Sequence, residues 1–457
     1  MIEYRNLRIA LLGGGSVGAQ VAAQLQQHGD ELAQRSGAGL ELIGVAVRDV
    51  TAARTPEIPQ HLLTTDAESL ILSADIVIEL MGGIEPARTY ILQAINSGAD
   101  VITANKALLA THGPELFDAA EQVGAQLYYE AAVGGAIPII RPLRDSLAGD
   151  RVERILGIVN GTTNFILDRM DTTGESLEDA LATATALGYA EADPTADVEG
   201  HDAAQKAAIL ASLAFHTTVP LADVYCEGIT KITRAQVESA RKGGYVIKLL
   251  AVCERLVDPI TGVAGVSARV HPALVPLAHP LAAVHGANNA VFLTAEAAGN
   301  LMFYGAGAGG RETASAVLGD VVSAARRHVI GGPGVAESTH ADLPVLSISS
   351  VTTRYQITLA VVDQPGVLAE IASIFSDHEV SVEAVAQSVG EPVAGVVGAG
   401  IGTATSAEIG SESPQGTATL VIGTHEASEA DLAATVAALK SSDVVRAIVS
   451  VLRVEGL

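Results

Sequence analysis

The sequence predicts an α/β protein with a Rossmann-like nucleotide-binding domain, an α+β middle domain and a C-terminal ferredoxin-like domain. Three observations predict this fold class. A glycine-rich turn at 13–18 stands between an apolar run and a helix-like stretch. Strands then alternate with helices as far as residue 129, which indicates a parallel sheet. From Tyr355 onward the elements follow the order βαββαβ.

Composition bounds the class of protein before any motif is considered. The 457 residues include 27 basic and 52 acidic side chains, a net charge of −25, which argues against binding to nucleic acid or anionic membranes. The two cysteines, Cys226 and Cys253, form no disulfide framework, which fits a cytoplasmic location. We find no signal-peptide pattern and no run of about 18 apolar residues, so we expect no membrane span.

The first element expected is a buried strand at Arg8–Leu12, which GGGSVG follows with Gly13, Gly15 and Gly18. In such a motif one glycine makes the tight turn, one lets the backbone approach a pyrophosphate, and one lets helix and strand pack closely. The phosphates meet the positive end of the next helix. Because strand, GxGxxG and helix stand in the required order, we prefer dinucleotide binding to a plain tight turn.

The second strand is expected at Glu41–Val47. A chain that prefers NAD usually offers a carboxylate at the end of this strand, whereas here Arg48 comes first and Asp49 follows. A guanidinium at this point suits the 2′-phosphate of NADP. The alternative is a surface arginine that pairs with its neighbour Asp49.

Two further strands are expected at Asp75–Glu79 and Asp100–Thr103, with a helix at Pro86–Ser97 between them. Ligands of such sheets bind at the carboxyl ends of the strands. Lys106 follows one of these ends and should face the nicotinamide side of the crevice, unless it is a solvated loop lysine. A last strand at Gln126–Tyr129 leads out of the nucleotide-binding domain.

Small residues dominate the segment that begins at Glu130. They imply either close backbone packing or carbonyl groups turned toward an ion. After a strand at Arg151–Val159 comes NGTTN, from Asn160 to Asn164, at the start of a helix. Its amide and hydroxyl groups are either helix caps or substrate contacts.

The stretch on which the rest of the chain depends runs from Gly188 to Leu213. A loop rich in carboxylates leads into a helix expected at His201–Leu213. On this helix Asp202 and Lys206 share one face, which continues as Ile209 and Leu213. This arrangement suggests a pocket wall with a charged end. An ordinary surface ion pair is the alternative.

Two segments closer to the C-terminus complete the prediction. GAGAGG at Gly305 is a second glycine-rich turn, and its long helix is expected to return to the nucleotide-binding domain and close the crevice. Within the C-terminal unit, Gly390–Gly416 is rich in small residues and is expected to be a floppy hairpin excursion.

Six motifs together resemble the homoserine dehydrogenase family, in its longer form with a C-terminal ACT domain. They are GGGSVG at Gly13, TANKALLA at Thr103, EAAVGGAIPII at Glu130, NGTTNFIL at Asn160, GYAEADPTADVEGHDAAQK at Gly188 and GAGAGGRETASAV at Gly305. The resemblance covers essentially the whole chain. It implies a dinucleotide-binding domain at 1–130 completed by helix 311–330, a substrate, catalytic and dimerisation domain at 131–310, and an ACT regulatory domain at 350–457.

The resemblance implies reduction of L-aspartate 4-semialdehyde to L-homoserine with NADPH or NADH, on the path to threonine and methionine. By position, Lys206 would protonate the forming alkoxide and Asp202 would orient the substrate or its water. Glu191 would hold the substrate's amino group, and Asp197 matches a further acidic position. Lys106 would lie near cofactor and substrate as a rival proton donor.

The resemblance and the two glycine-rich turns also imply binding residues. Cofactor contacts are expected at Gly13, Gly15, Val17, Gly18, Ala46, Arg48, Thr103, Lys106, Gly188, Gly305 and Gly307. A monovalent cation, Na⁺ or K⁺, would bind the backbone at Glu130, Val133, Gly135 and Ile137. Threonine would bind between paired ACT domains at Asp363, Gly366, Val367 and Leu368, in a homodimer or homotetramer.

General chemistry favours the same reading. Hydride arriving at an aldehyde leaves a negative oxygen, which needs a positioned donor such as a lysine. A zinc enzyme would need Cys/His ligands, and His271, His279 and His285 match no ligand spacing. Two rivals remain. A hydroxy-acid dehydrogenase with an ACT tail would need a His–carboxylate pair, and an inactive amino-acid sensor would have a broken Asp202/Lys206 block.

Overall fold

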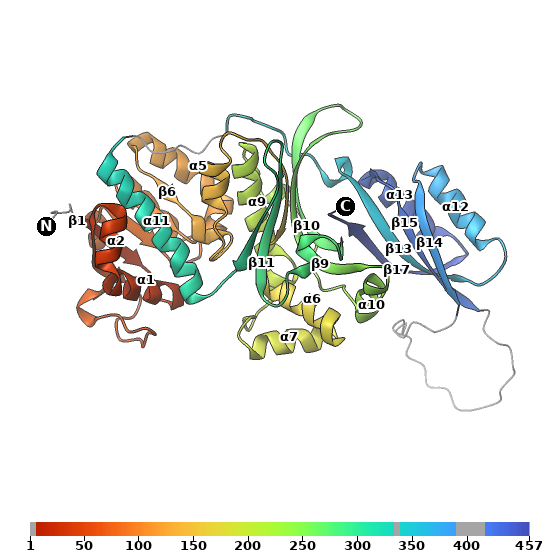
Figure 1. Ribbon diagram of the computed structural model, residues 1–457, viewed down its shortest axis with the longest axis horizontal. Coiled ribbons are helices and arrows are strands. Elements are labelled where there is room, and N and C mark those ends of the chain that lie inside the picture. The colour runs from red at the N-terminus through yellow and green to blue at the C-terminus, as the bar shows by residue number, and fades with distance from the viewer. Residues whose placement is uncertain (1–5, 333–338, 390–415, 457) are drawn as a thin grey trace.

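The computed structural model describes residues 6–332, 339–389 and 416–456 (Figure 1). The nucleotide-binding part lies at one end of the elongated molecule, a second sheet lies in the middle, and the C-terminal unit lies at the other end. Nearly all of the predicted Gly390–Gly416 excursion falls outside the described residues. In the parts that are described, no helix combines the length and apolarity needed to cross a membrane.

The first sheet has six parallel strands in the order β3-β2-β1-β4-β5-β6. Its strands are β1 Asn6–Leu12, β2 Gly39–Ala46, β3 Leu63–Thr64, β4 Ile76–Glu79, β5 Asp100–Thr103 and β6 Leu127–Tyr128. The apolar side chains of β1, β4 and β5 are fully buried, as the unbroken apolar runs in the sequence predict. The carboxyl ends of the strands therefore form one shared edge, where the glycine-rich turn lies.

Six helices cover this sheet: α1 Ser16–Gln27, α2 Gly29–Ser36, α3 Ala67–Leu72, α4 Ala87–Asn96, α5 Lys106–Val123 and α11 Gly310–Ile330. The last of them comes back from the middle of the molecule and packs against α1 and α2 (Figure 1). Val317 and Val321 of α11 share a buried core with Ile9 and Val21. The predicted return of this helix is confirmed, whereas α2, α3 and β3 were not predicted.

The middle of the molecule is built on a second, mostly antiparallel sheet. Its strands are β7 Val152–Ile158, β8 Tyr225–Cys226, β9 Tyr245–Val257, β10 Ala264–Pro276, β11 Asn288–Ala295 and β12 Gly299–Ala306. Its helices are α6 Gly161–Thr173, α7 Leu177–Ala186, α8 Thr195–Val198, α9 His201–Phe215 and α10 Arg234–Lys242. Helix α9 packs on β9 and β10 and also on α5, so it joins the two parts of the protein.

The C-terminal unit has the ferredoxin-like order that the sequence predicts. Its elements are β13 Thr352–Val362, α12 Val367–Asp377, β14 Val382–Val389, β15 Thr417–Thr424, β16 Ala427–Ser428, α13 Glu429–Ser441 and β17 Val445–Val454. The sheet order is β17-β13-β15-β14. Strand β17 also pairs in parallel with β10 at Ala273 and Leu274, so the two sheets form one continuous sheet of 11 strands.

Candidate active site

The glycine-rich turn has the geometry that a pyrophosphate requires. A Cβ on Gly13 would lie 2.6 Å from the carbonyl oxygen of Leu80, and one on Gly18 would lie 2.0 Å from the carbonyl oxygen of Gly13. Gly15 has no heavy atom within 4 Å of such a Cβ, so its face is open. Helix α1 begins here without a side-chain cap and without an acidic residue in its first turn. Its N-terminal N–H groups are therefore available to an anion.

The second glycine-rich turn lies against the first. A Cβ on Gly310, at the start of α11, would lie 3.2 Å from the carbonyl oxygen of Ser16 in α1. The N-termini of two helices thus meet beside Gly13–Gly18, with Gly305 and Gly307 just before α11. Both turns fit a bound dinucleotide.

Arg48 follows β2 and is exposed. The carboxylate of Asp49 accepts hydrogen bonds from the backbone and hydroxyl of Thr51, and among the described residues no ion pair joins it to Arg48. Arg54, which the sequence did not single out, donates to the carbonyls of Asp49 and Ala52. Its Nε lies 2.9 Å from where a Cβ on Gly14 would be.

Ala46 and Thr103 lie at the carboxyl ends of β2 and β5, on the same edge of the sheet. The carbonyl of Ala46 accepts a hydrogen bond from the backbone N–H of Gly13 at 2.9 Å. Thr103 is buried and donates its hydroxyl to Glu79 at 2.6 Å. Asn105 caps α5 through the backbone N–H of Leu108, which fixes the start of the helix that carries Lys106. Val17 is half-buried on the first turn of α1.

One buried carboxylate lies between two lysines. Asp202 Oδ2 accepts from Lys206 Nζ at 2.9 Å, and Asp202 Oδ1 lies 2.9 Å from Lys106 Nζ. Lys206 also donates to the carbonyl of Val159 at 2.6 Å. Its side chain is 10% exposed, whereas that of Lys106 is 40% exposed. The cluster therefore has one nearly buried amine and one more exposed amine. Asp202 and Lys206 form a buried pair rather than an ordinary surface pair, and Lys106 is paired with Asp202 although it is partly exposed.

Asn160 ties the cluster to a second carboxylate. Its amide nitrogen donates to Asp202 at 2.9 Å and to Asp197 at 2.6 Å, and its amide oxygen accepts from the backbone N–H of Thr163. Asn160 is thus both a helix cap and part of the site. The sequence predicts that Asn160 is either a helix cap or a substrate contact. Nothing in the sequence places it against Asp197 and Asp202, which lie roughly forty residues away.

Neighbouring charges set the protonation of the cluster. Burial works to lower the pKa of Lys106, but Asp202, with smaller contributions from Asp197 and Glu191, raises it above the ordinary value of 10.5. Burial works to raise the pKa of Asp202, yet Lys206 and Lys106 hold it well below its ordinary value. Burial, only partly offset by the hydrogen bond from Asn160, raises the pKa of Asp197. The site thus pairs an ionised Asp202 carboxylate with a Lys106 amine that is held in its charged form.

Glu191 is exposed, and its charge acts on Lys106 across the site. Gly188 ends α7 with φ +78°, a conformation that favours glycine, and starts the loop toward Glu191. This loop is fastened by Thr162, whose hydroxyl donates to the carbonyl of Tyr189. Hydrogen bonds and ion pairs join Asp197, Asp202, Lys106 and Lys206, with Asn160 between the two aspartates, whereas Glu191 acts on Lys106 through its charge.

The predicted pocket wall on α9 is divided between two places. Asp202 and Lys206 belong to the carboxylate–lysine cluster. Ile209 and Leu213 instead line a cavity of about 630 Å³ between α5 and α9, with Leu109 and Phe117 opposite. Because the chemistry lies with the charged groups, we assign the reaction to the cluster rather than to this cavity.

The segment of small residues after Glu130 packs backbone against backbone. A Cβ on Gly135 would lie 2.3 Å from the carbonyl oxygen of Gly307. The carboxylate of Glu130 accepts from the backbone N–H groups of Ile139, Ile140 and Arg141. Val133 and Ile137 are buried. Close packing, one of the two predicted alternatives, is confirmed, and the described residues contain no cluster of three or more metal-binding side chains.

The ACT loop lies at the start of α12. Gly366 has φ +97° and precedes the helix, which begins without a side-chain cap. The backbone N–H of Asp363 donates to the carbonyl of Gly416 at 2.7 Å. Val367 is buried, whereas Leu368 is 48% exposed.

Comparison with known proteins agrees with this geometry. Residues 13–130 match the model "Homoserine dehydrogenase, NAD binding domain", residues 138–322 match "Homoserine dehydrogenase", and residues 355–399 match "ACT domain". The homoserine dehydrogenase of Corynebacterium glutamicum is 53% identical over 98% of this chain and 95% of its own length. That of Mycobacterium tuberculosis is 54% identical over 99% of both chains. A crystal structure of a homoserine dehydrogenase from Thiobacillus denitrificans superposes with a TM-score of 0.87 at 37% identity, over 99% of this chain and 98% of that one.

Proposed function

The chain belongs to the homoserine dehydrogenase family of nicotinamide-dependent oxidoreductases, and from this premise we propose how its own residues reduce L-aspartate 4-semialdehyde to L-homoserine. The observation that carries the proposal is the carboxylate of Asp202 between Lys206 and Lys106, at the carboxyl edge of the nucleotide-binding sheet. A dinucleotide fits beside it, because the face of Gly15 is open and the N-terminus of α1 is uncapped.

The nicotinamide supplies a hydride to the aldehyde carbon when it is bound. Lys206 then donates a proton to the forming oxyanion. Two of its hydrogens are held by Val159 and Asp202, which fixes the direction of the third. Lys106, the more exposed amine, faces the crevice and attracts the substrate's carboxylate. Glu191 and Asp197 receive the substrate's ammonium group.

The test is turnover of L-aspartate 4-semialdehyde by the intact chain and by Lys206→Met. We expect turnover by the intact chain and a loss of kcat of at least 100-fold in the variant, which is the range for general acid catalysis. The matched control is Lys242→Met, at an exposed lysine of α10. No turnover by the folded intact chain would contradict the proposal. Undiminished turnover by Lys206→Met would show that Lys106 or water, rather than Lys206, donates the proton.

We propose that NADPH is the preferred cofactor. Arg48 lies at the end of β2, where a 2′-phosphate is held in this fold, and it has no carboxylate partner among the described residues. Replacing Arg48 by Ala should therefore lower kcat/KM for NADPH at least tenfold and leave that for NADH nearly unchanged. Arg234→Ala, on the surface of α10, is the control. An unchanged NADPH/NADH ratio would contradict this preference.

We propose further that threonine binds the loop Asp363–Leu368 between ACT domains of a homodimer or homotetramer in the cytoplasm. The uncapped start of α12 and the exposed Leu368 support a ligand and a partner surface there. Binding inhibits only if threonine prefers a less active arrangement. Inhibition that Asp363→Ala weakens would support this role, and activity independent of threonine would contradict it.

A monovalent cation at the backbone of Glu130, Val133, Gly135 and Ile137 completes the proposal. The supporting observation is that two carbonyl oxygens approach this segment: those of Ile137 and Gly307 would lie 2.8 Å and 2.3 Å from a Cβ on Gly134 and Gly135. Activity in K⁺ or Na⁺ should exceed activity in tetramethylammonium at equal ionic strength. Equal rates in all three salts would contradict it.

A further inference from the structure

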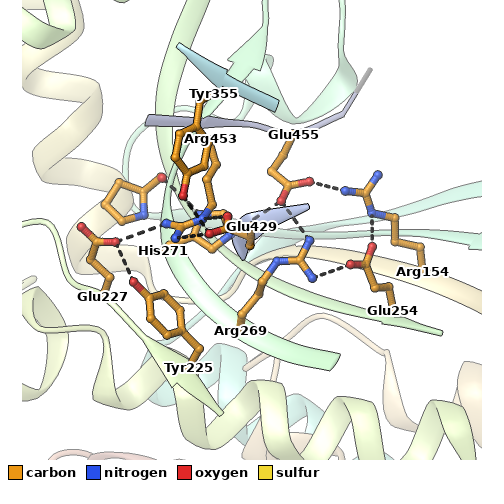
Figure 2. A network of polar contacts seen from close by, with 11 residues as sticks. Arg154, Tyr225, Glu227, Glu254, Arg269, His271, Tyr355, Glu429, Arg453 and Glu455 are labelled. Atoms are coloured by element: carbon orange, nitrogen blue, oxygen red, sulfur yellow. Dashed lines mark hydrogen bonds and ion pairs between the residues drawn. The ribbon is translucent and has the colours of Figure 1, made fainter. Parts of the chain in front are cut away.

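The last strand of the chain carries an arginine that joins both halves of the continuous sheet. Arg453, on β17, donates to Glu429 of the ACT domain and to Glu227 of the middle domain (Figure 2). Its guanidinium lies over the rings of Tyr225 and Tyr355, at 5.3 and 5.7 Å. The hydroxyl of Tyr225 donates to Glu227 at 3.2 Å. One cation thus holds carboxylates and rings from two domains.

A second group of charges fixes the same strand in place. Glu455, directly after β17, pairs with the buried Arg269 and with Arg154, and both arginines also contact Glu254 (Figure 2). The backbone N–H of Glu455 donates to the carbonyl of Leu274 at 3.0 Å. These contacts hold the C-terminal end of β17 in place, so the strand is a fixed support for Arg453.

The segment that Arg453 holds is in backbone contact with the active-site turn. The N–H of Glu227 donates to the carbonyl of Val270, which fixes the segment to β10. A Cβ on the next residue, Gly228, would lie 2.2 Å from the carbonyl oxygen of Val198, and the N–H of Ile229 donates to that oxygen at 2.8 Å. No gap remains between the two segments, so a shift in one displaces the other.

Val198 belongs to the turn that carries two acidic groups of the site. Asp197 precedes it in α8, and Asp202 follows in the first turn of α9. Gly200 between them has φ +85°, and its position is crowded by the sulfur of Cys226, in the strand before Glu227. The contact between Gly228 and Val198 therefore bears on the turn that positions both Asp197 and Asp202.

We propose that Glu227 and Arg453 are positioning residues for the reaction, because they hold the Gly228 segment against the α8–α9 turn that sets Asp197 and Asp202. The inference rests on the proposed function for its kinetic consequence but not for its structural one. It makes the C-terminal strand part of the support of the active site. It also gives the ACT domain a direct route to the carboxylates that bind the substrate.

The experiment compares Glu227→Gln with Arg354→Gln in the full chain. The control removes the ion pairs of Arg354 with Glu383 and Glu426 inside the ACT domain, away from the middle domain. We expect Glu227→Gln to raise KM for L-aspartate 4-semialdehyde about 3- to 10-fold, a range typical of residues that act through a network. The dissociation constant for NADPH and the melting temperature should stay close to those of the control.

Hydrogen exchange supplies a readout that does not depend on turnover. The amides of residues 198–202 should exchange faster in Glu227→Gln and remain unchanged in Arg354→Gln. Tyr225→Phe, which keeps the ring over Arg453 but removes the hydroxyl from Glu227, should show a smaller effect in the same direction. Unchanged exchange and KM in Glu227→Gln would overturn the inference. Absent turnover in the intact chain would instead overturn the proposed function.

Discussion

Asp202 carries two different interactions on its two oxygen atoms. One oxygen accepts from Lys206, and the other faces Lys106. Because Lys206 is nearly buried and Lys106 is 40% exposed, the two amines have different access to the crevice. In the proposed mechanism this difference divides the work between them: Lys206 delivers the proton and Lys106 attracts the substrate.

This division predicts distinct kinetics for the two lysines. Lys106→Met should raise KM for L-aspartate 4-semialdehyde at least tenfold, because the substrate loses a cation that meets its carboxylate. Its kcat should fall less than that of Lys206→Met, which lacks the proton donor. Steady-state kinetics at saturating NADPH would measure both effects. A larger fall in kcat for Lys106→Met than for Lys206→Met would show that Lys106, not Lys206, is the proton donor.

At the scale of elements, the contacts of α9 could be predicted from the sequence, whereas those of β17 could not. The pair Asp202/Lys206 is four residues apart on one helix, so the sequence itself shows that the side chains are neighbours. The strand that precedes Lys106 predicts only that this lysine faces the nicotinamide side of the crevice. That Lys106 lies near the substrate is implied by the family resemblance. The contacts of Asn160 and of Arg453 join segments far apart in the chain, and no local pattern encodes them. Likewise strand β3 and helices α2 and α3 span too few residues, 2, 8 and 6, for their periodicity to be recognised.

The end of β17 yields a stability prediction. Glu455 is buried against Arg269, and Arg269 and His271 hold the pKa of Glu455 far below its ordinary value although burial works against them. A lowered folded-state pKa stabilises the protein above the unfolded value of about 4.5, and this stabilisation is lost as pH falls below it. Glu455→Gln should therefore lower the free energy of unfolding by about 3 kcal/mol at pH 7 and by less at pH 4.

Chemical denaturation at the two pH values would measure this difference. Glu153→Gln, at an exposed glutamate on β7 beside Arg154, is the matched control and should change the free energy of unfolding by less than about 0.5 kcal/mol. A cost for Glu455→Gln that does not shrink at low pH would show that the carboxylate is not held by these charges.

At the scale of the whole molecule, helices and strands from distant parts of the chain meet at one site. Helix α11 returns to the nucleotide-binding domain, and α9 packs on α5 (Figure 1). The fold class, the family and the order of elements could be predicted, because each rests on local periodicity or on contiguous motifs. The joining of the two sheets through β17 and β10 could not, since it involves only two residue pairs and a network of buried charges.

The central claim is that Asp202 holds Lys106 in its charged form, ready to attract the substrate's carboxylate, and the pH dependence of kcat/KM tests it most directly. Since Asp202 raises the pKa of Lys106, the reduction rate of the intact chain should remain high until about pH 10.5 or above. Asp202→Asn should move the alkaline limb to lower pH, because Lys106 loses the neighbouring opposite charge. An alkaline limb that stays where it is in Asp202→Asn would contradict the claim.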